Sequence, residues 1–418
     1  MLGLGIACVI SAAAWVYLVA ARGGFWLTSQ RLPPVDAPGA RRPAPAWPAV
    51  AAVVPARNEA ESLPVTLPAL LAQDYPGEFR VFLVDDSSDD GTGAIAAELG
   101  EKAARDGGAP LILVHGRPRP DEWAGKVWAM AHGLAAVTGT TAAEPDADHD
   151  GALPEYVLFT DADIAWAPSA LRDLVAAAEA DDRALVSQMA LLRAATRWER
   201  VIVPAFVYFF AQLYPFRNVN DPKSRTAAAA GGCMLVRRSA LEEAGGLTPL
   251  KGALIDDVAL GTLLKGHGNR TWLGLTTDIR SVRPYPDLSS LWHMIARSAY
   301  VQLRYNPLLL AGTIIGLLLL YVTPPAGLIA GLIGAALGGA GLGGVGLDGA
   351  LAGIAGLAGW ALMTASYLPM LRLYRLSALR APMLPAIALL YAAMTADSAR
   401  RHYSGRAVAW RGRAADRV

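Results

Sequence analysis

The order of apolar and polar positions divides the chain into three regions. Residues 2–21 form an unbroken apolar run of about 20 residues, the length that a helix needs to cross a bilayer. Residues 49–280 alternate between short apolar runs and amphipathic stretches, and residues 307–399 are again mostly apolar. The pattern therefore predicts an N-terminal membrane anchor, a central α/β domain and a C-terminal group of transmembrane or interfacial helices.

The central region has the texture of a sheet with helices between its strands. Five apolar runs have the length of buried strands: residues 49–56, 80–86, 111–115, 156–163 and 183–191. Residues 60–73 and 169–180 have the spacing of helices. This alternation predicts a mostly parallel α/β sheet, whose ligands bind beyond the carboxyl ends of the strands.

The flanking segments complete the division of the chain. No basic region precedes the first apolar run and no cleavage site follows it, so we expect a retained anchor rather than a signal peptide. The predicted parts are an anchor (1–22), a stiff Pro/Arg-rich linker (23–48), the α/β domain (49–280), an interfacial segment (281–306), transmembrane or interfacial helices (307–399) and a basic cytoplasmic tail (400–418).

The number of membrane crossings depends on the last apolar run. Basic residues flank residues 381–399 on both sides, which favours an interfacial or re-entrant helix there, although an extra crossing within 308–345 would change the count. The Gly/Ala-rich stretch between these regions favours close helix packing. Residues 201–216 are apolar and aromatic but short and interrupted by proline, which favours a position at the membrane surface.

Composition supports a membrane protein and excludes other classes. The chain is 54% hydrophobic and 17% charged, with a net charge of +1. A nucleic-acid partner is not expected, because no concentrated basic face is present. Two cysteines, Cys8 and Cys233, provide neither a disulfide scaffold nor a thiolate metal cluster, and we expect each to pack in an apolar interior.

One acidic segment imitates a calcium site. Asp146, Asp148, Asp150 and Gly151 follow the start of an EF-hand loop, but Val157 stands where the loop needs a bidentate glutamate. The segment is therefore predicted to be a solvated acidic loop.

Asp161 and Asp163 are different because an apolar strand leads directly into them. Their carboxylates could hold Mg²⁺ or Mn²⁺, which prefer oxygen ligands and share their coordination with phosphate oxygens. The alternative is a helix cap, although Pro168 and Ser169 lie closer to the start of the next helix.

Two other strand ends carry polar groups. The first strand ends in Pro55, Arg57 and Glu59, and the next ends in Asp85 and Asp86 before a Ser/Asp/Gly turn. A carboxylate at a strand end can accept the hydrogens of a base or a ribose. Further on, Lys126 in "AGKVWAMAHGL" could balance diphosphate charge, or could simply be an exposed lysine at a helix start.

The ordered motifs resemble those of the family 2 glycosyltransferases, whose catalytic domain has the GT-A fold, over residues 50–280. The resemblance implies a nucleotide site formed by the P-x-R-N-E strand end and the D-D-x-S-x-D-G-T turn. The G-K-x-x-A-x-N-x-G motif of the family is matched except that Ala131 replaces the usual asparagine. The D-x-D motif corresponds to Asp161 and Asp163, which implies a metal site.

Two later segments also follow the family order. The small residues Gly231, Gly232 and Cys233 correspond to the family's acceptor site. In "LIDDVAL", Asp257 aligns with the general base and Asp256 takes the position of the preceding glutamate. Without the resemblance, these two acids would be favourable charges at a helix start.

The membrane-bound members carry a Q-x-x-R-W motif, and no full match is present. Arg297, Gln302 and Arg304 have related chemistry and are hypothetical phosphate ligands, with snorkelling interfacial arginines as the alternative. In general likeness the chain is most similar to the hopene-associated subgroup. That similarity implies a multi-pass protein of the bacterial inner membrane, a cytoplasmic catalytic domain and a polycyclic or other lipid acceptor.

The sequence thus predicts an inverting glycosyltransferase that uses Mg²⁺ or Mn²⁺, a nucleotide sugar of the UDP type and a lipid acceptor in the bilayer. A processive polysaccharide synthase, a membrane-linked nucleotidyltransferase and a non-catalytic membrane scaffold are the alternatives. The second would need a Gly-rich basic loop that "VVPARNEAESL" lacks, and the third predicts missing carboxylates that are present here.

Overall fold

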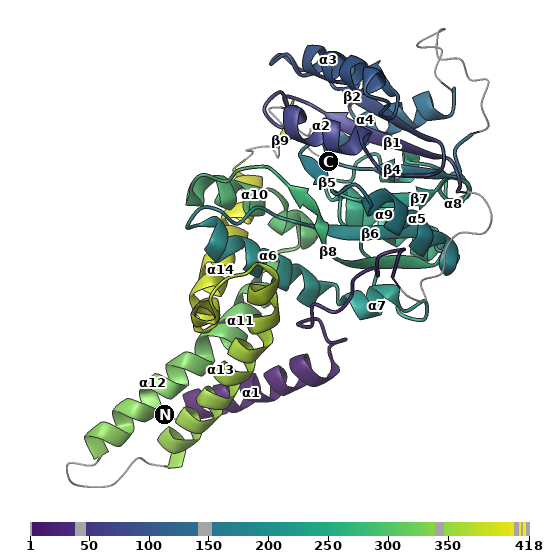
Figure 1. The fold of residues 1–418 in the computed structure, drawn as a ribbon. Coiled ribbons are helices and arrows are strands. Elements are labelled where there is room, and N and C mark those ends of the chain that lie inside the picture. The colour runs from purple at the N-terminus through teal and green to yellow at the C-terminus, as the bar shows by residue number, and fades with distance from the viewer. Residues whose placement is uncertain are drawn as a thin grey trace. The chain divides into compact units, whose positions relative to one another are not determined.

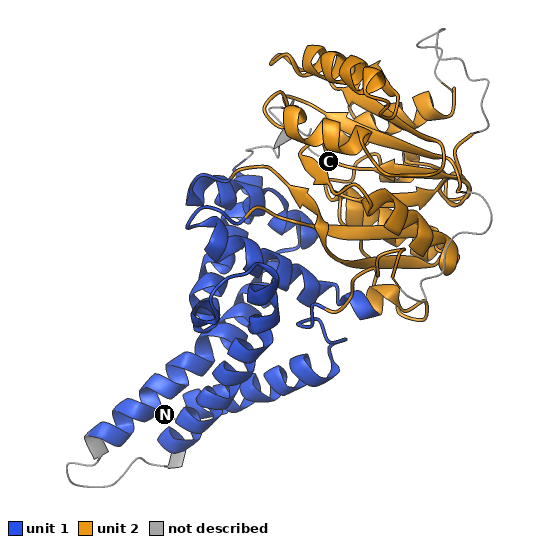
Figure 2. Ribbon diagram, in the orientation of Figure 1, with its two compact units in different colours: residues 1–28, 194–217, 285–406 blue, residues 29–193, 218–284, 407–418 orange. Residues whose placement is uncertain are grey.

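A computed structural model describes residues 2–37, 47–140, 153–338, 347–404, 409–410 and 413–414. Two compact units make up the chain (Figure 2). The helical unit contains Met1–Thr28, Ala194–Arg217 and Tyr285–Arg406, and the sheet unit contains Ser29–Arg193, Asn218–Pro284 and Ala407–Val418. The acidic loop with Asp146, Asp148, Asp150 and Gly151 lies outside the described residues.

The sheet unit is built on eight strands in the order β3-β2-β1-β4-β7-β6-β8-β5. Their bounds are β1 Val50–Ala56, β2 Phe79–Asp85, β3 Leu111–His115, β4 Tyr156–Phe159, β5 Ile164–Trp166, β6 Leu185–Leu191, β7 Met234–Arg237 and β8 Thr271–Ser281. The five predicted strands are all present. Strands β5, β7 and β8 are additional, and β7 and β5 pair antiparallel with their neighbours, so the sheet is mixed.

Helices cover both faces of this sheet (Figure 1). They are α2 Leu63–Leu71, α3 Thr92–Arg105, α4 Gly125–Val137, α5 Ala170–Ala180, α8 Arg238–Glu243, the short 3₁₀ turn Thr248–Leu250 and α9 Asp256–Gly266. Helix α7 Phe216–Asn220 crosses the unit boundary at residue 217. Alternate residues of one strand enter different cores: Val50 and Val54 pack with α2, α3 and α5, whereas Val53 packs with α4, α8 and α9. This period of two follows from the pleat of the strands and explains their continuous apolar runs.

Helix α4 approaches the sheet closely at one glycine. A Cβ atom at Gly133 would stand 2.5 Å from Val53 Cγ1 and 2.9 Å from Val84 Cγ2, so any larger residue would push α4 away from β1 and β2. The first turn of α4, with Lys126, is thereby fixed near the carboxyl ends of these strands.

The helical unit consists of helices and short helical turns, and most of its helices are long and apolar. Their bounds are α1 Leu2–Ala21, α6 Glu199–Leu213, α10 Leu288–Gln302, α11 Pro307–Leu317, a π-helical turn Leu318–Val322, α12 Thr323–Gly338, α13 Leu347–Leu373, a 3₁₀ turn Ala378–Met383 and α14 Leu384–Tyr403. Within the described residues, four helical runs are long and apolar enough to cross a membrane: Leu2–Ala21, Pro307–Ala336, Asp348–Leu373 and Ala378–Tyr403. Close glycine contact joins α12 to α13, because a Cβ at Gly331 would stand 2.6 Å from Gly353 Cα.

A buried glutamate lies where the chain enters and leaves this unit. Glu199 has no exposed surface, and its Oε2 accepts hydrogen bonds from the backbone N–H groups of Ala195 and Thr196, both at 2.7 Å. Its Oε1 accepts from the N–H of Tyr285 at 2.8 Å. The carboxylate thus ties together the two segments next to the unit boundaries at residues 194 and 285.

Candidate active site

The turns after β1 and β2 interlock through side chains and backbone. The N–H groups of Asn58, Glu59 and Ala60 donate to Ser88 Oγ, Thr92 Oγ1 and Asp90 Oδ2 at 2.8–3.0 Å. The N–H of Asp89 donates in return to Asn58 Oδ1 at 3.1 Å. Asn58 and Ser87 have left-handed φ values of 51° and 56°, which these bonds stabilise. The two predicted nucleotide segments therefore form one rigid edge.

Arg57 and the acids after β2 belong to the same edge. The Arg57 guanidinium donates to the carbonyl oxygens of Asp86 and Ser87, and its Nη1 lies 3.9 Å from Asp86 Oδ2. Asp86 is almost fully buried, whereas Asp85 is partly exposed and accepts from the N–H of Ser88 at 3.0 Å. Pro55 lies in β1 and is buried. The side chains of Arg57 and Asp85 thus stabilise the turn.

Lys126 lies at the centre of an acidic cluster. Its Nζ is 2.8 Å from Asp161 Oδ1 and 2.9 Å from Asp256 Oδ2. Burial opposes the lysine charge, but Asp161 and Asp256 outweigh it and raise the pKa of Lys126 above its ordinary value. Burial raises the pKa of Asp161; Lys126 opposes this shift, and Asp163 and Asp256 add to it. The structure thus brings together three residues that are far apart in the sequence.

Asp257 lies beside this cluster in the first turn of α9. Its Oδ2 accepts the N–H of Gly231 at 2.9 Å, and its Oδ1 accepts the N–H of Val258 at 2.8 Å. Burial first, and the adjacent Asp256 second, raise the pKa of Asp257 to about 6. A carboxylate with a pKa close to neutral is suited to accept a proton during a reaction.

Gly231 leaves the space in which these groups meet. A Cβ atom there would stand 3.0 Å from Lys126 Nζ and 3.6 Å from Asp257 Oδ2. A Cβ on Gly232 would stand 3.1 Å from Ile164 Cδ1. Cys233 is fully buried in the core, which raises the pKa of its thiol to about 12. Backbone and small size, rather than the thiol, are what this segment offers to a ligand.

Asp163 has a different partner, which the sequence did not reveal. Arg283 Nε donates to Asp163 Oδ2 at 2.6 Å, and Arg283 Nη2 donates to Glu59 Oε1 at 2.8 Å. Ser281 Oγ also donates to Asp163 Oδ2, at 3.2 Å. The guanidinium therefore joins the turn after β1 to the acidic turn after β4. Its only signal in the sequence is a polar Ser-Val-Arg segment following a buried strand.

The helix-cap alternative for Asp161 and Asp163 has no support in the geometry. Helix α5 begins at Ala170 with Ser169 in the N-cap position. The Ser169 hydroxyl makes no capping bond and instead donates to Asp173 Oδ2 at 3.4 Å. Both acids face other charged groups, as described above.

The donor atoms suit a divalent cation whose coordination a ligand completes. Oxygen atoms dominate the site, and the Lys126 ammonium lies between Asp161 and Asp256 as a cation would. Within the described part of the chain, no three His, Cys, Asp or Glu residues converge as a closed metal cage. Such a site fits Mg²⁺ or Mn²⁺ only together with phosphate or water oxygens.

The predicted phosphate ligands Arg297, Gln302 and Arg304 belong to the helical unit, whereas the acidic cluster belongs to the sheet unit. Arg297 is exposed on α10, and Gln302 donates from Nε2 to the hydroxyl of Tyr214. Arg304 is exposed and has a left-handed φ of 53°, as has Tyr305. The Tyr305 carbonyl accepts from the hydroxyl of Tyr300 at 2.8 Å, which stabilises the turn.

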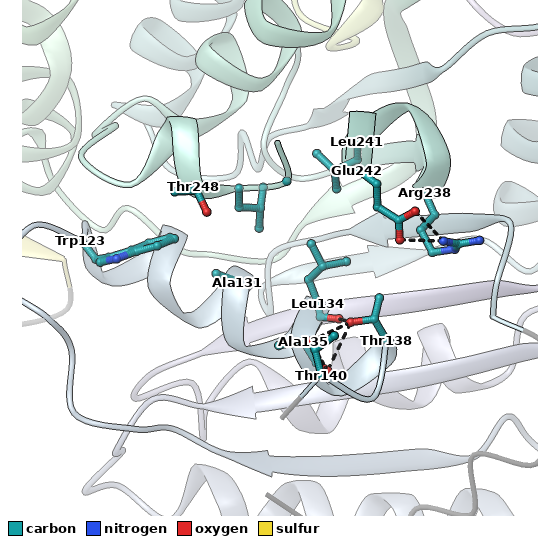
Figure 3. A pocket seen from close by; sticks show the side chains of 12 residues that line it. Trp123, Ala131, Leu134, Ala135, Thr138, Thr140, Arg238, Leu241, Glu242 and Thr248 are labelled. Atoms are coloured by element: carbon teal, nitrogen blue, oxygen red, sulfur yellow. Dashed lines mark hydrogen bonds and ion pairs between the residues drawn. The ribbon is translucent and has the colours of Figure 1, made fainter. Parts of the chain in front are cut away.

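A cavity of about 300 Å³ lies away from the acidic cluster, against the later turns of α4 (Figure 3). Its lining includes Trp123, Leu134, Thr138, Leu241 and Thr248, and none of the residues of the cluster. The Arg238–Glu242 ion pair, at 2.6 Å, borders it. It is therefore not part of the candidate site.

The mixed sheet, with acidic groups at the carboxyl ends of β1, β2 and β4, defines an α/β domain of the GT-A type. Residues 51–245, a little under half of the chain, match the model of the family described as Glycosyl transferase family 2. The match ends before Asp256, Asp257 and Arg283. No curated protein matches the chain.

Solved structures with the same fold include a mannosyltransferase from Pyrobaculum calidifontis in complex with GDP-Man and Mn²⁺. It is 21% identical, has a TM-score of 0.53, and the match covers 95% of this chain and 99% of that chain. TarS from S. aureus is 18% identical with a TM-score of 0.38, and the match covers 60% of this chain and 40% of TarS. Glucosyl-3-phosphoglycerate synthase from Mycobacterium tuberculosis, with Mn²⁺ and UDP-glucose, is 20% identical with a TM-score of 0.34, over 59% of this chain and 75% of that chain.

Proposed function

We propose that this chain is an inverting, divalent-cation-dependent glycosyltransferase that moves a sugar from a nucleotide sugar to a hydroxyl group of a membrane lipid. The observation that carries the proposal is the meeting of Asp161, Asp256 and Lys126 beside Asp257, at an edge of the sheet in the region that matches the glycosyl transferase family 2 model.

The donor nucleotide is assigned to the edge formed by the interlocked turns. Asp85 and Asp86 lie in a turn that is held in place by hydrogen bonds within it and to the turn after β1. Rigid placement reduces the entropy that binding costs. Lys126 lies close enough to Asp161 to neutralise part of the diphosphate charge when that group enters the site.

Asp257 is assigned as the general base. In an inverting transfer, the acceptor hydroxyl loses its proton as its oxygen attacks C1 of the sugar. The bond from C1 to the diphosphate oxygen breaks at the same time, and its electron pair stays on the diphosphate oxygen. Asp257 accepts this proton, with Gly231 N–H and Val258 N–H fixing its two oxygens. Asp256 positions Lys126 nearby.

Asp161 and Asp163 are the protein ligands assigned to Mg²⁺ or Mn²⁺. When bound there, the cation would act as a Lewis acid that stabilises the leaving nucleoside diphosphate. The Mn²⁺ in two of the similar structures supports this choice of cation. Asp163 Oδ2 accepts hydrogen bonds from Arg283 Nε and Ser281 Oγ.

A lipid acceptor is proposed because four helical runs are candidate membrane spans. An acceptor held in the bilayer would be reached by a domain tethered to the same membrane. The likeness to the hopene-associated subgroup makes hopanoid-type polycyclic lipids the first acceptors to test. UDP sugars are the first donors, and the GDP-Man in a similar structure justifies adding GDP sugars.

The test supplies the full-length protein in lipid nanodiscs with labelled UDP and GDP sugars and with extracted bacterial lipids. We expect labelled lipid that requires Mg²⁺ or Mn²⁺ and is lost in Asp257→Asn. Transfer of label to no lipid with any donor would contradict the proposal and favour a non-catalytic scaffold. A long polymer instead of a singly glycosylated lipid would identify the processive alternative.

A further inference from the structure

Arg283 contacts two acids that lie in different turns of the candidate site. Its guanidinium contacts Asp163 at 2.6 Å and Glu59 at 2.8 Å, and it retains 31% side-chain exposure, against 8% and 7% for the two acids. Glu59 lies in the turn that interlocks with the nucleotide turn after β2. One side chain thus contacts both a proposed cation ligand and the proposed nucleotide edge.

The charges of the candidate site are unbalanced. Lys126 pairs with Asp161 and Asp256, and Arg283 pairs with Asp163 and Glu59. With Asp257, which interacts electrostatically with Asp256 and Lys126, five carboxylates stand against these two positive side chains. A nucleoside diphosphate alone would meet the excess negative charge. A cation alone would have to share Asp163 with a guanidinium that already occupies Oδ2.

We propose that Arg283 couples the two binding events, so that the divalent cation and the nucleoside diphosphate each bind tightly only when the other is present. The inference rests on the proposed function and adds a positioning residue to it. Arg283 competes for Asp163 in the free protein. When the diphosphate is present, the planar guanidinium exchanges this carboxylate for phosphate oxygens, which it can contact with two parallel N–H groups.

The geometry favours such an exchange over a fixed structural ion pair. Arg283 follows β8, whose last residue is Ser281, so its side chain extends from the end of a strand rather than from a helix. Asp163 also has a second donor, Ser281 Oγ at 3.2 Å, and its backbone C=O accepts from the N–H of Val282 at 2.9 Å. Asp163 therefore stays oriented after the guanidinium leaves it.

The experiment measures Mn²⁺ binding to the full-length protein in nanodiscs by electron paramagnetic resonance, without nucleotide and with saturating UDP or GDP. For the wild type we expect the nucleotide to lower the Kd for Mn²⁺ by about fivefold or more, and Mn²⁺ to lower the nucleotide Kd by the same factor. We call the ratio by which each ligand lowers the Kd of the other the coupling factor. In Arg283→Gln this factor falls toward one, while Mn²⁺ alone binds at least as tightly as to the wild type.

Arg280→Gln is the matched control. Arg280 lies in β8, the strand that Arg283 follows, is exposed, and donates from Nε to the carbonyl of Thr277 at 2.8 Å. This variant should keep the wild-type factor. Arg283→Lys keeps the charge but cannot contact both acids as a fork, so it should give an intermediate factor, and it carries the test if Arg283→Gln fails to fold.

Three results would overturn the coupling: a wild-type factor of one, an unchanged factor in Arg283→Gln, or weaker binding of Mn²⁺ alone to that variant. The last would show that Arg283 only orients Asp163 for the cation. Failure of the proposed function has a different signature, because the wild type would then bind neither UDP nor GDP even with Mn²⁺. Sugar transfer with unchanged coupling in Arg283→Gln would overturn this inference alone.

Discussion

At the scale of single residues, the raised pKa of Asp257 sets the pH dependence of the proposed reaction. A general base works only when it is ionised, so kcat/KM should rise with pH through about 6 and be level above it. Asp257→Asn should lower kcat by about 10²- to 10⁴-fold and remove this rise. The pH profile of lipid glycosylation checks both effects.

Glu243→Gln is the control for that substitution, since Glu243 is an exposed acid of α8 in the same unit. It should leave the pH profile unchanged. An Asp257→Asn enzyme with the wild-type profile would show that another group takes the proton.

The same pKa links activity to stability. Asp257 has an ordinary pKa of 3.8 and a folded pKa of about 6, so the folded protein binds this proton more tightly than the unfolded chain does. Its contribution to stability is full below pH 3.8 and is lost as the pH rises through 6. The ionised carboxylate that the reaction needs is therefore the less stable form of the folded protein.

Gly231 is a residue whose function lies in the absence of a side chain. In Gly231→Ala the new methyl group would lie 3.0 Å from Lys126 Nζ and displace the ammonium from Asp161 and Asp256. We expect kcat/KM to fall roughly ten- to a hundredfold. The free energy of unfolding should change by less than about 1 kcal/mol, because the displaced atom, Lys126 Nζ, is at the end of a flexible side chain.

Steady-state kinetics and thermal unfolding separate the two effects of this substitution. Gly266→Ala is the control, because nothing lies within 4 Å of a Cβ at the end of α9, and helical alanine is favoured over glycine. An equal loss of activity in both variants would contradict the role of Gly231.

At the scale of elements, Glu199 ties the beginning of α6 to the segment before α10. Glu199→Gln leaves one acceptor oxygen and turns an amide N–H₂ toward a backbone N–H, so a buried donor loses its partner. The cost should be about 1–3 kcal/mol, seen as a lower thermal midpoint of the protein in nanodiscs.

Asp287→Asn provides the comparison for Glu199→Gln. Asp287 also accepts a backbone N–H, that of Ser290 at 2.8 Å, but it caps α10 at an exposed position. Asparagine caps helices as well as aspartate does, so this change should have little effect. Equal thermal midpoints for both variants would mean that the buried position of Glu199 adds nothing to the stability of the protein.

Patterning predicted those elements whose apolar runs are continuous. Strands β1, β2, β3, β4 and β6 were predicted because the residues on both of their faces pack against one or other of the two cores. Strand β8 was not, because Thr271, Gly274 and Thr276 interrupt its apolar run at buried positions. Arg283 was missed for the same reason, since its position depends on β8.

The sequence predicted the order of the acidic motifs along the chain, but not that their side chains meet. Position in the sequence places Asp161 and Asp256 at a sheet edge and a helix start, but it does not bring both to one ammonium. That contact depends on the pairing of β4 with β7 and on the packing of α9, which involve residues distant in the sequence. Long-range pairing of this kind leaves no local signal.

At the scale of the whole molecule, α14 decides the topology in the membrane. The run Ala378–Tyr403 is long enough to cross, but α14 packs along α10, which carries exposed His293 and Arg297. Trp292 Nε1 donates to Asp397 Oδ2 at 2.9 Å, and the N–H of Tyr300 donates to Ser398 Oγ at 3.0 Å. Polar contacts of this kind favour the interface over the hydrocarbon core.

We therefore expect three crossings, by α1, Pro307–Ala336 and Asp348–Leu373, with the C-terminus on the same side as the sheet unit. Arg372 and Arg375 at the end of α13 agree with a cytoplasmic position. Impermeant thiol labelling of a cysteine introduced at Ser404 measures the side. Labelling from outside intact cells would establish a fourth crossing, and the two buried native cysteines give a low background.

The ion pair between Arg283 and Glu59 also has a consequence for biosynthesis. The two residues are 224 positions apart in the sequence. At roughly 5–20 residues per second, a ribosome needs about ten seconds or more to add the second after the first. During that time α6 is made as well, while Glu59 and Asp163 still lack their common partner. The proposed nucleotide edge therefore reaches its final charge balance only after the strand that precedes Arg283 has been added.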